Sequence, residues 1–204
     1  MKLFGNLFKK ENSKAVSRQS LLELGFSEEV LAILYQASGN GLYPLQNYEE
    51  ATIGLSFSRP EGEAEQIVEE LRSKILPRGY CPFISDVEFE RGNKSRIGVV
   101  KTDNQFQLLK ILDTNGENYD VSNEDVIGKL TEWHKRFPFT VIGANFDWVD
   151  LAFIKMPTGI ELAELAQEIM ELCPDAVEDA DSAEDIQDLI IDLKDTKRLL
   201  LWWD

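Results

Sequence analysis

The chain has 204 residues, 43% of them hydrophobic, and its 21 Lys and Arg against 37 Asp and Glu give a net charge of −16. This length suits one domain with a short appendage, and no apolar run reaches the about 20 residues of a membrane span. The acidic balance argues against direct nucleic-acid binding, which needs clustered Lys and Arg. The N-terminus MKLFGNLFKK lacks the long apolar core of a secretory signal, so a cytoplasmic protein is predicted.

Residues 1–19 are predicted to be a flexible or amphipathic extension, and residues 20–204 a single domain. The extension repeats apolar residues at helical spacing beside lysines: Leu3, Phe4, Leu7 and Phe8. Two interpretations stay open, a short anchor on a membrane or partner and a frayed tail. The patch is too short to hold a membrane firmly by itself, which favours the tail.

Proline, glycine and hydrophobic periodicity divide the first half of the domain into five elements. A helix is predicted within residues 20–41, with Ser27 as its N-cap and Gly39 at its end. Residues 51–59 alternate apolar and polar side chains as a half-buried strand does, and Pro60 closes that strand. The elements predicted next are a helix and two strands joined by a turn, at residues 61–75, 80–89 and 96–102.

The second half is predicted to begin with a helix near residues 103–112 and a turn in which Gly116 is left-handed. Further elements follow in order: a helix capped by Ser122, two antiparallel strands within 139–155, a helix ended by Pro174, a helix over 182–194 and a strand over 198–204. This order predicts an α+β fold, with a mixed, largely antiparallel sheet of about five to seven strands and helices packed on it.

The chain ends in RLLLWWD, in which both faces of a strand would be mostly apolar. Alternation places Leu199, Leu201 and Trp203 on one face and Leu200 and Trp202 on the other. This pattern predicts an interior strand that is covered on both sides.

Several short motifs occur in one order in the second half: Asn118-Tyr119-Asp120, Trp133, Gly143, Asp147, Cys173-Pro174-Asp175 and Trp202-Trp203-Asp204. Together they resemble a bacterial family of unknown function, DUF4253, over roughly residues 80–204. The resemblance implies a cytosolic bacterial protein and implies no reaction.

Catalytic and metal-binding patterns are weak. His134 is the only histidine, and no catalytic motif surrounds it, Cys81 or Cys173, so a structural histidine and two buried free thiols are predicted. Residues 113–125 are rich in oxygen ligands, yet Gly116 is the fourth residue from Asp113, and a calcium loop needs glycine at the sixth. A self-packed turn is favoured there, and no metal or cofactor is predicted.

The candidate site is a set of aromatic and acidic residues: Tyr119, Asp120, Asp147, Trp148, Asp175, Trp203 and Asp204. Tryptophan is a frequent interface anchor and an equally frequent core residue. The acids have a competing interpretation as turn and cap residues.

Charge favours one functional hypothesis. Residues 161–192 contain twelve carboxylates and neither Lys nor Arg. The leading prediction is a non-enzymatic, acidic protein-binding module that holds a basic partner, with a toxin-immunity role as an analogy of size and charge. The alternative is an enzyme or small-ligand binder with a pocket near Asp147, Asp175 and the C-terminal strand. A convex acidic helix pair over a filled core would favour the first, and a pocket lined by Trp203 with shifted carboxylates the second.

Overall fold

The protein is described here from a computed structural model, which covers residues 21–22, 24–39, 41–88, 94–177 and 183–203. The predicted extension over residues 1–19 lies outside these described residues, and so does Asp204.

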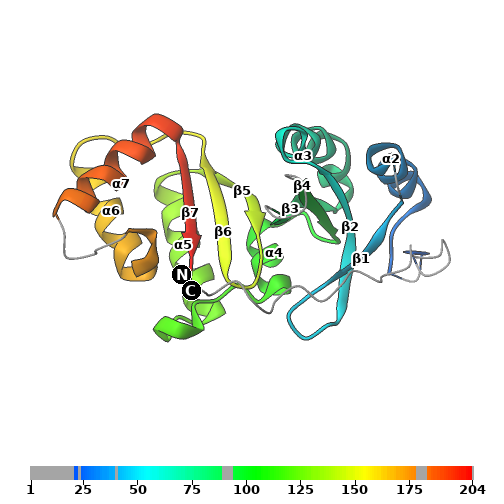
Figure 1. Cartoon of the computed structure of the whole chain (residues 1–204), viewed down its shortest axis with the longest axis horizontal. Coiled ribbons are helices and arrows are strands. Elements are labelled where there is room, and N and C mark those ends of the chain that lie inside the picture. Colours follow the sequence, from blue (N-terminus) through cyan, green and yellow to red (C-terminus); the bar gives the residue numbers. More distant parts are fainter. Residues whose placement is uncertain (1–20, 23, 40, 89–93, 178–182, 204) are drawn as a thin grey trace.

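One seven-stranded mixed sheet runs through the molecule in the order β1-β2-β4-β3-β5-β6-β7 (Figure 1). Its strands are β1 Tyr43–Gln46, β2 Thr52–Pro60, β3 Cys81–Glu88, β4 Lys94–Val100, β5 Phe139–Ala144, β6 Trp148–Phe153 and β7 Arg198–Trp202. All neighbours are antiparallel except β3 and β5, which are parallel and share one residue pair, Ile84 with Gly143. The predicted fold class is confirmed.

The parallel contact needs a glycine. A Cβ atom on Gly143 would lie 2.8 Å from the ring of Trp148 and 3.0 Å from the carbonyl oxygen of Ile84. Only a residue without a side chain therefore allows the two strands to approach.

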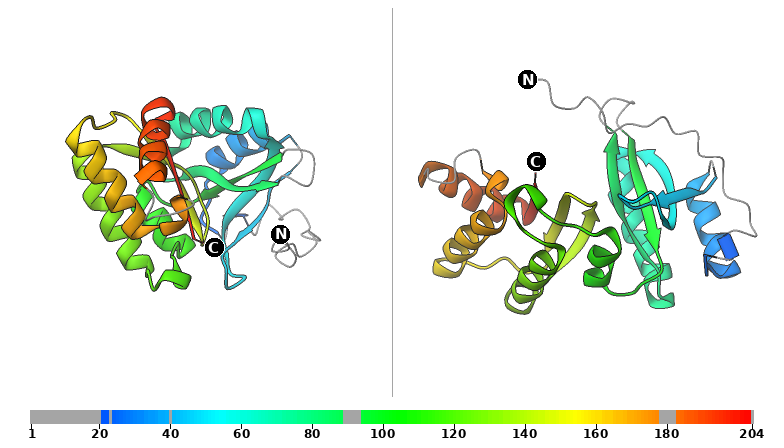
Figure 2. Two further views of the ribbon diagram at one scale, coloured as in Figure 1. Left: turned by 60° about the vertical axis from the view of Figure 1, so that its left-hand side comes forward. Right: turned by 90° about the horizontal axis from the view of Figure 1, so that it is seen from below.

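In the part of the chain that the structure describes, six α-helices cover the two faces of the sheet: α2 Glu28–Ser38, α3 Glu61–Ile75, α4 Gln105–Leu112, α5 Asn123–Arg136, α6 Ile160–Leu172 and α7 Ala183–Thr196. Helices α2 and α3 pack mainly with β2 and β4 in one core, and α4 to α7 pack in another with β5, β6 and β7 and with residues of β1, β3 and β4. Helices α2 and α3 lie beside one half of the sheet and α5, α6 and α7 beside the other, with α4 near the middle (Figures 1 and 2). The larger core contains Trp133 and Trp203.

Local sequence signals start and end several helices as predicted. The Ser27 hydroxyl accepts a hydrogen bond from the Val30 N–H, and Ser122 forms a reciprocal capping box with Asp125. Helix α3 has the predicted bounds.

The predicted left-handed conformation of Gly116 is wrong. Its φ is −122°, and the left-handed residues of this loop are Asp113 and Asp120, at 57° and 56°. Aspartate tolerates that conformation better than most residues. Glycine is needed at 116 for space, because a Cβ atom there would lie 2.5 Å from the ring of Trp203.

The predicted interior position of the last strand is also wrong. β7 is the final strand in the sheet order, so one of its edges has no strand beside it in the described sheet. Leu199, Leu201 and Trp203 are buried, whereas Leu200 is 56% exposed and Trp202 38% exposed. Both faces of β7 are apolar in sequence, but only one face is buried, because the helical layer packs on only one side of this strand.

Candidate functional site

Trp203 closes the C-terminal end of the larger core. Its side chain is 3% exposed, and its indole N–H donates to the Leu172 carbonyl oxygen at 2.9 Å. Its backbone N–H donates to the carbonyl oxygen of Asp147 at 3.0 Å. With Gly116 against the ring, these contacts make Trp203 a structural plug.

Two further predicted residues, Tyr119 and Asp175, contact each other. The Tyr119 hydroxyl donates to the Asp175 carboxylate, and the Cys173 thiol donates to the Trp202 carbonyl oxygen at 3.1 Å. Burial raises the pKa of Cys173 to about 11, so this sulfur stays a thiol at neutral pH and is a poor nucleophile. The Tyr119–Asp175 bond joins two short 310 turns, Glu117–Tyr119 and Pro174–Ala176, and we refer to Tyr119, Asp175 and Trp203 together as the Trp203 cluster.

The remaining predicted residues lie elsewhere. Asp120 lines a surface hollow of about 390 Å³ formed by the loop before α5. Trp148 belongs to the other face of the sheet, where it contacts the core beneath α2 and α3, so it does not meet Trp203. Asp204 is outside the described residues. In the described parts of the chain, no three His, Cys, Asp or Glu side chains are grouped to hold a metal ion.

Sequence reasoning did not identify a second hollow, of about 260 Å³, where β3 and β5 begin. Its polar lining is Arg72, Cys81, Asp103, Gln105, His134 and Thr140. The hollow exists because the two parallel strands pair only at Ile84 and Gly143, so their starting ends are not joined by strand pairing.

Side chains satisfy the β5 edge that this gap exposes. The Phe139 N–H donates to His134 Nδ1 at 3.2 Å, and the Val141 N–H donates to Gln105 Oε1 at 3.0 Å. Arg72 Nη2 donates to the Val141 carbonyl oxygen across 69 positions of sequence. These three side chains thus take the place of a neighbouring strand.

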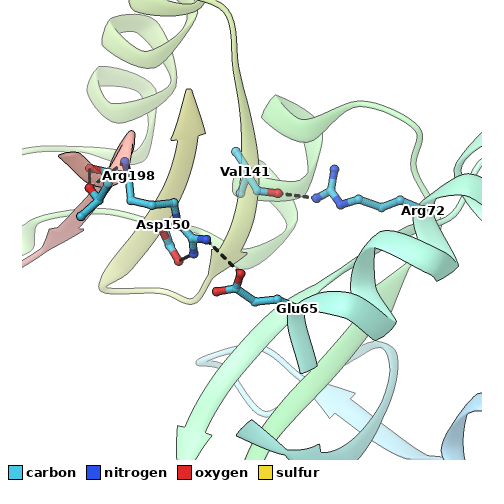
Figure 3. A network of polar contacts seen from close by, with 6 residues as sticks. Glu65, Arg72, Val141, Asp150 and Arg198 are labelled. Atoms are coloured by element: carbon cyan, nitrogen blue, oxygen red, sulfur yellow. Dashed lines mark hydrogen bonds and ion pairs between the residues drawn. The ribbon is translucent and has the colours of Figure 1, made fainter. Parts of the chain in front are cut away.

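An ion network joins α3 to the last two strands (Figure 3). Arg198 makes two hydrogen bonds to the Asp150 carboxylate and one of 3.1 Å to Glu65 on α3. Burial raises the pKa of Asp150, and the Arg198 guanidinium offsets part of that rise. The geometry is a bidentate pair that is largely removed from water.

Helices α6 and α7 carry an acidic surface. Exposed carboxylates lie on both helices, at Glu161, Glu164, Glu171, Asp188 and Asp192; we call these five residues the acidic face. The inward side of α6 is filled by Leu162, Leu165, Ala166, Ile169 and Leu172. Within the described ranges, no residue of the acidic face has an ion-pair partner within 4 Å.

Glu168 differs from the acidic face because it has internal partners. Its carboxylate accepts hydrogen bonds from Arg136 at 2.6 Å and from the Trp133 indole at 2.8 Å. Burial acts to raise the pKa of Glu168, but these two donors outweigh it, so the pKa is lowered.

The lowered pKa gives a testable pH dependence. A carboxyl whose pKa is lower in the folded state adds stability above its unfolded pKa, near 4.5, and loses it as the pH falls through the folded value. We expect Glu168→Gln to lower the free energy of unfolding by about 1–2 kcal/mol at pH 7. In urea titrations, its difference from wild type should shrink steadily towards pH 3, and a constant difference would contradict this role.

Comparison with known proteins gives a family for this chain. The family model described as "Domain of unknown function (DUF4253)" matches residues 96–204, just over half of the sequence. The chain belongs to the DUF4253 family. This confirms the resemblance, although the DUF4253 match begins within β4 and not at residue 80. No curated protein and no solved structure matches the chain.

The DUF4253 match includes the Trp203 cluster, His134, Gln105 and the acidic face. Arg72 and Cys81, on the other wall of the second hollow, precede it. In the described residues, no helix is both long and apolar enough to cross a membrane.

Proposed function

We propose that the protein is a non-enzymatic binding module whose acidic face holds a basic protein partner. One observation carries the proposal: five carboxylates project from α6 and α7 over a filled core, and within the described residues none of them has an ion-pair partner within 4 Å. The negative electrostatic potential of these carboxylates would speed association with a partner of opposite charge and make the association rate sensitive to salt.

Apolar side chains on the same two helices support a contact surface. Ile160 at the start of α6 is 79% exposed, and Ile191 on α7 is 44% exposed. Protein interfaces combine apolar anchors with a polar rim, and the acids next to these residues in sequence, Glu161 and Asp192, would supply part of that rim. A basic toxin domain, bound in an immunity role, is the partner class that size and charge favour by analogy.

The alternative of a pocket near Asp147 and Asp175 has less support. Asp147 offers its backbone carbonyl to Trp203, and Asp175 accepts the Tyr119 hydroxyl. Trp203 itself is buried in the core. These contacts hold the end of the chain in place, and none of them leaves a group free for chemistry.

The test compares two variants that each lose four negative charges. The first carries Glu161→Gln, Glu164→Gln, Asp188→Asn and Asp192→Asn. The matched control carries Glu49→Gln, Glu61→Gln, Glu63→Gln and Glu69→Gln, all exposed positions away from α6 and α7. Each protein is immobilised and used to capture partners from lysate of the native host.

We expect wild type and control to capture the same basic protein, and the first variant to lose it. With the captured partner purified, the association rate constant of the first variant should be lower by at least about tenfold at low salt. The association rate constant of wild type should fall towards that of the first variant as ionic strength rises, because salt screens the charges. Equal capture by both variants, or a rate that does not respond to salt, would contradict the proposal.

A further inference from the structure

A half-buried guanidinium without an ion-pair partner among the described residues lies in the wall of the second hollow. Arg72 Nη2 donates to the Val141 carbonyl oxygen, while Nε is buried and has no hydrogen-bond partner among the described residues. Within the same residues, Arg72 forms no ion pair within 4 Å. The guanidinium points towards β5, and one terminal nitrogen is directed away from Val141 (Figure 3).

Burying a cation without an anion is costly, so this arrangement favours a negative ligand. Burial lowers the pKa of Arg72, in agreement with that cost. A guanidinium binds a carboxylate through paired N–H donors, and this is the anion that it recognises best by geometry.

The same hollow contains a carboxylate of its own. Asp103 is exposed in the loop before α4, and among described residues it has no ion-pair partner. Its charge would attract an ammonium group and repel a second anion. The rest of the lining includes Leu76, Phe139 and Ile154, which offer apolar surface.

His134 and Thr140 add polar atoms to the lining. His134 uses Nδ1 to accept the Phe139 N–H, and its ring packs edge-on against Phe106 and Phe139. Its Nε2 has no hydrogen-bond partner in the described part of the chain, and neither has the Thr140 hydroxyl.

We propose that this hollow binds a small amino-acid-like zwitterion, with its carboxylate at Arg72 and its ammonium group at Asp103. A zwitterion complements both charges, whereas a simple anion would complement only one. The net charge of −16 also repels anions and leaves a neutral molecule unaffected. The volume, about 260 Å³, is below the range of about 300–1,000 Å³ for drug-sized ligands and suits a molecule of amino-acid size.

This site is independent of the proposed partner, because none of its lining residues belongs to the acidic face. A failure of one proposal therefore leaves the other standing.

His134 provides the test, because it is the only histidine and lines the hollow. Its ring signals can be followed by proton–carbon NMR while L-leucine, L-methionine or L-phenylalanine is added to the whole protein, up to about 10 mM. We expect at least one of these amino acids to shift the His134 signals in a saturable way. The deaminated and decarboxylated analogues of that amino acid should each bind at least about tenfold more weakly.

Substitutions of Asp103 and Arg72 test which end of the ligand each residue binds. Asp103→Asn, at an exposed position, should lower the affinity for the amino acid by about tenfold and leave the affinity for the deaminated analogue unchanged. Arg72→Lys should weaken both, because lysine lacks the paired donors. Asp113→Asn, in the other hollow, is the matched control and should bind as wild type does.

Three results would overturn the proposal. The first is that no amino acid of the panel moves the His134 signals at the highest concentration. The second is that the deaminated analogue binds as tightly as the amino acid. The third is that Asp103→Asn binds the amino acid as wild type does, a result that does not depend on whether the Arg72 variant folds.

Discussion

Replacing Trp203 by alanine is expected to lower the free energy of unfolding by about 3–5 kcal/mol. The side chain is almost fully buried, packs against Gly116 and donates its indole N–H to the Leu172 carbonyl oxygen. The substitution would leave a cavity and an acceptor without its donor. Urea denaturation followed by circular dichroism measures the loss.

Trp202→Ala is the matched control, because it removes the same side chain one residue away. Trp202 is 38% exposed, and the atom that accepts the Cys173 thiol is its backbone carbonyl oxygen, which the substitution keeps. We expect a loss of about 1 kcal/mol. Equal losses for the two variants would contradict the assignment of Trp203 as the plug and Trp202 as a surface residue.

Arg198→Met is expected to be similarly damaging, at about 3–5 kcal/mol, because it leaves the largely buried Asp150 carboxylate without its cation. Glu65→Gln should cost less than about 1 kcal/mol, since Glu65 is exposed and its pairing with Arg198 is screened by water. Removing both charges, with Asp150→Asn and Arg198→Met, should restore at least half of the loss. An additive double variant would show that the two side chains do not act as a pair.

The loss of stability in Arg198→Met should depend on pH, and the direction of this dependence follows from Asp150. Burial raises the pKa of Asp150, and removing Arg198 removes the group that offsets this rise. A carboxyl whose folded pKa is raised stabilises the fold below its unfolded pKa and loses that contribution as the pH rises through the folded value. The deficit of Arg198→Met relative to wild type should therefore be smaller at pH 4 than at pH 7.

The helices could be predicted well because their signals are local. Periodicity and caps within a few residues define α3 and α5, and α3 has the predicted bounds. β1 was not predicted: Tyr43–Gln46 is four residues long, contains Pro44 and becomes a strand only by pairing with β2. The edge position of β7 was also missed, since strand order depends on contacts between distant segments.

The candidate site could be predicted only in part. Tyr119 donates to Asp175 and Trp203 packs against Gly116, but Trp148 lies on the other face of the sheet. The second hollow has no sequence signature, because it is a gap in strand pairing and its walls come from separate helices, strands and loops. No spacing rule connects Arg72 with Val141 across 69 positions.

The single parallel pair between β3 and β5 has a mechanical consequence. This pair divides the sheet into two antiparallel ribbons, β1-β2-β4-β3 and β5-β6-β7. Within each ribbon, neighbouring strands share several residue pairs. Between the ribbons, strand pairing resists twisting at Ile84 and Gly143 only, and the rest of the resistance comes from side chains such as Arg72 and Arg198. A twist of one ribbon against the other would move Arg72 relative to β5 and so alter the second hollow. An occupant that binds one twist more tightly would then shift the protein towards that twist.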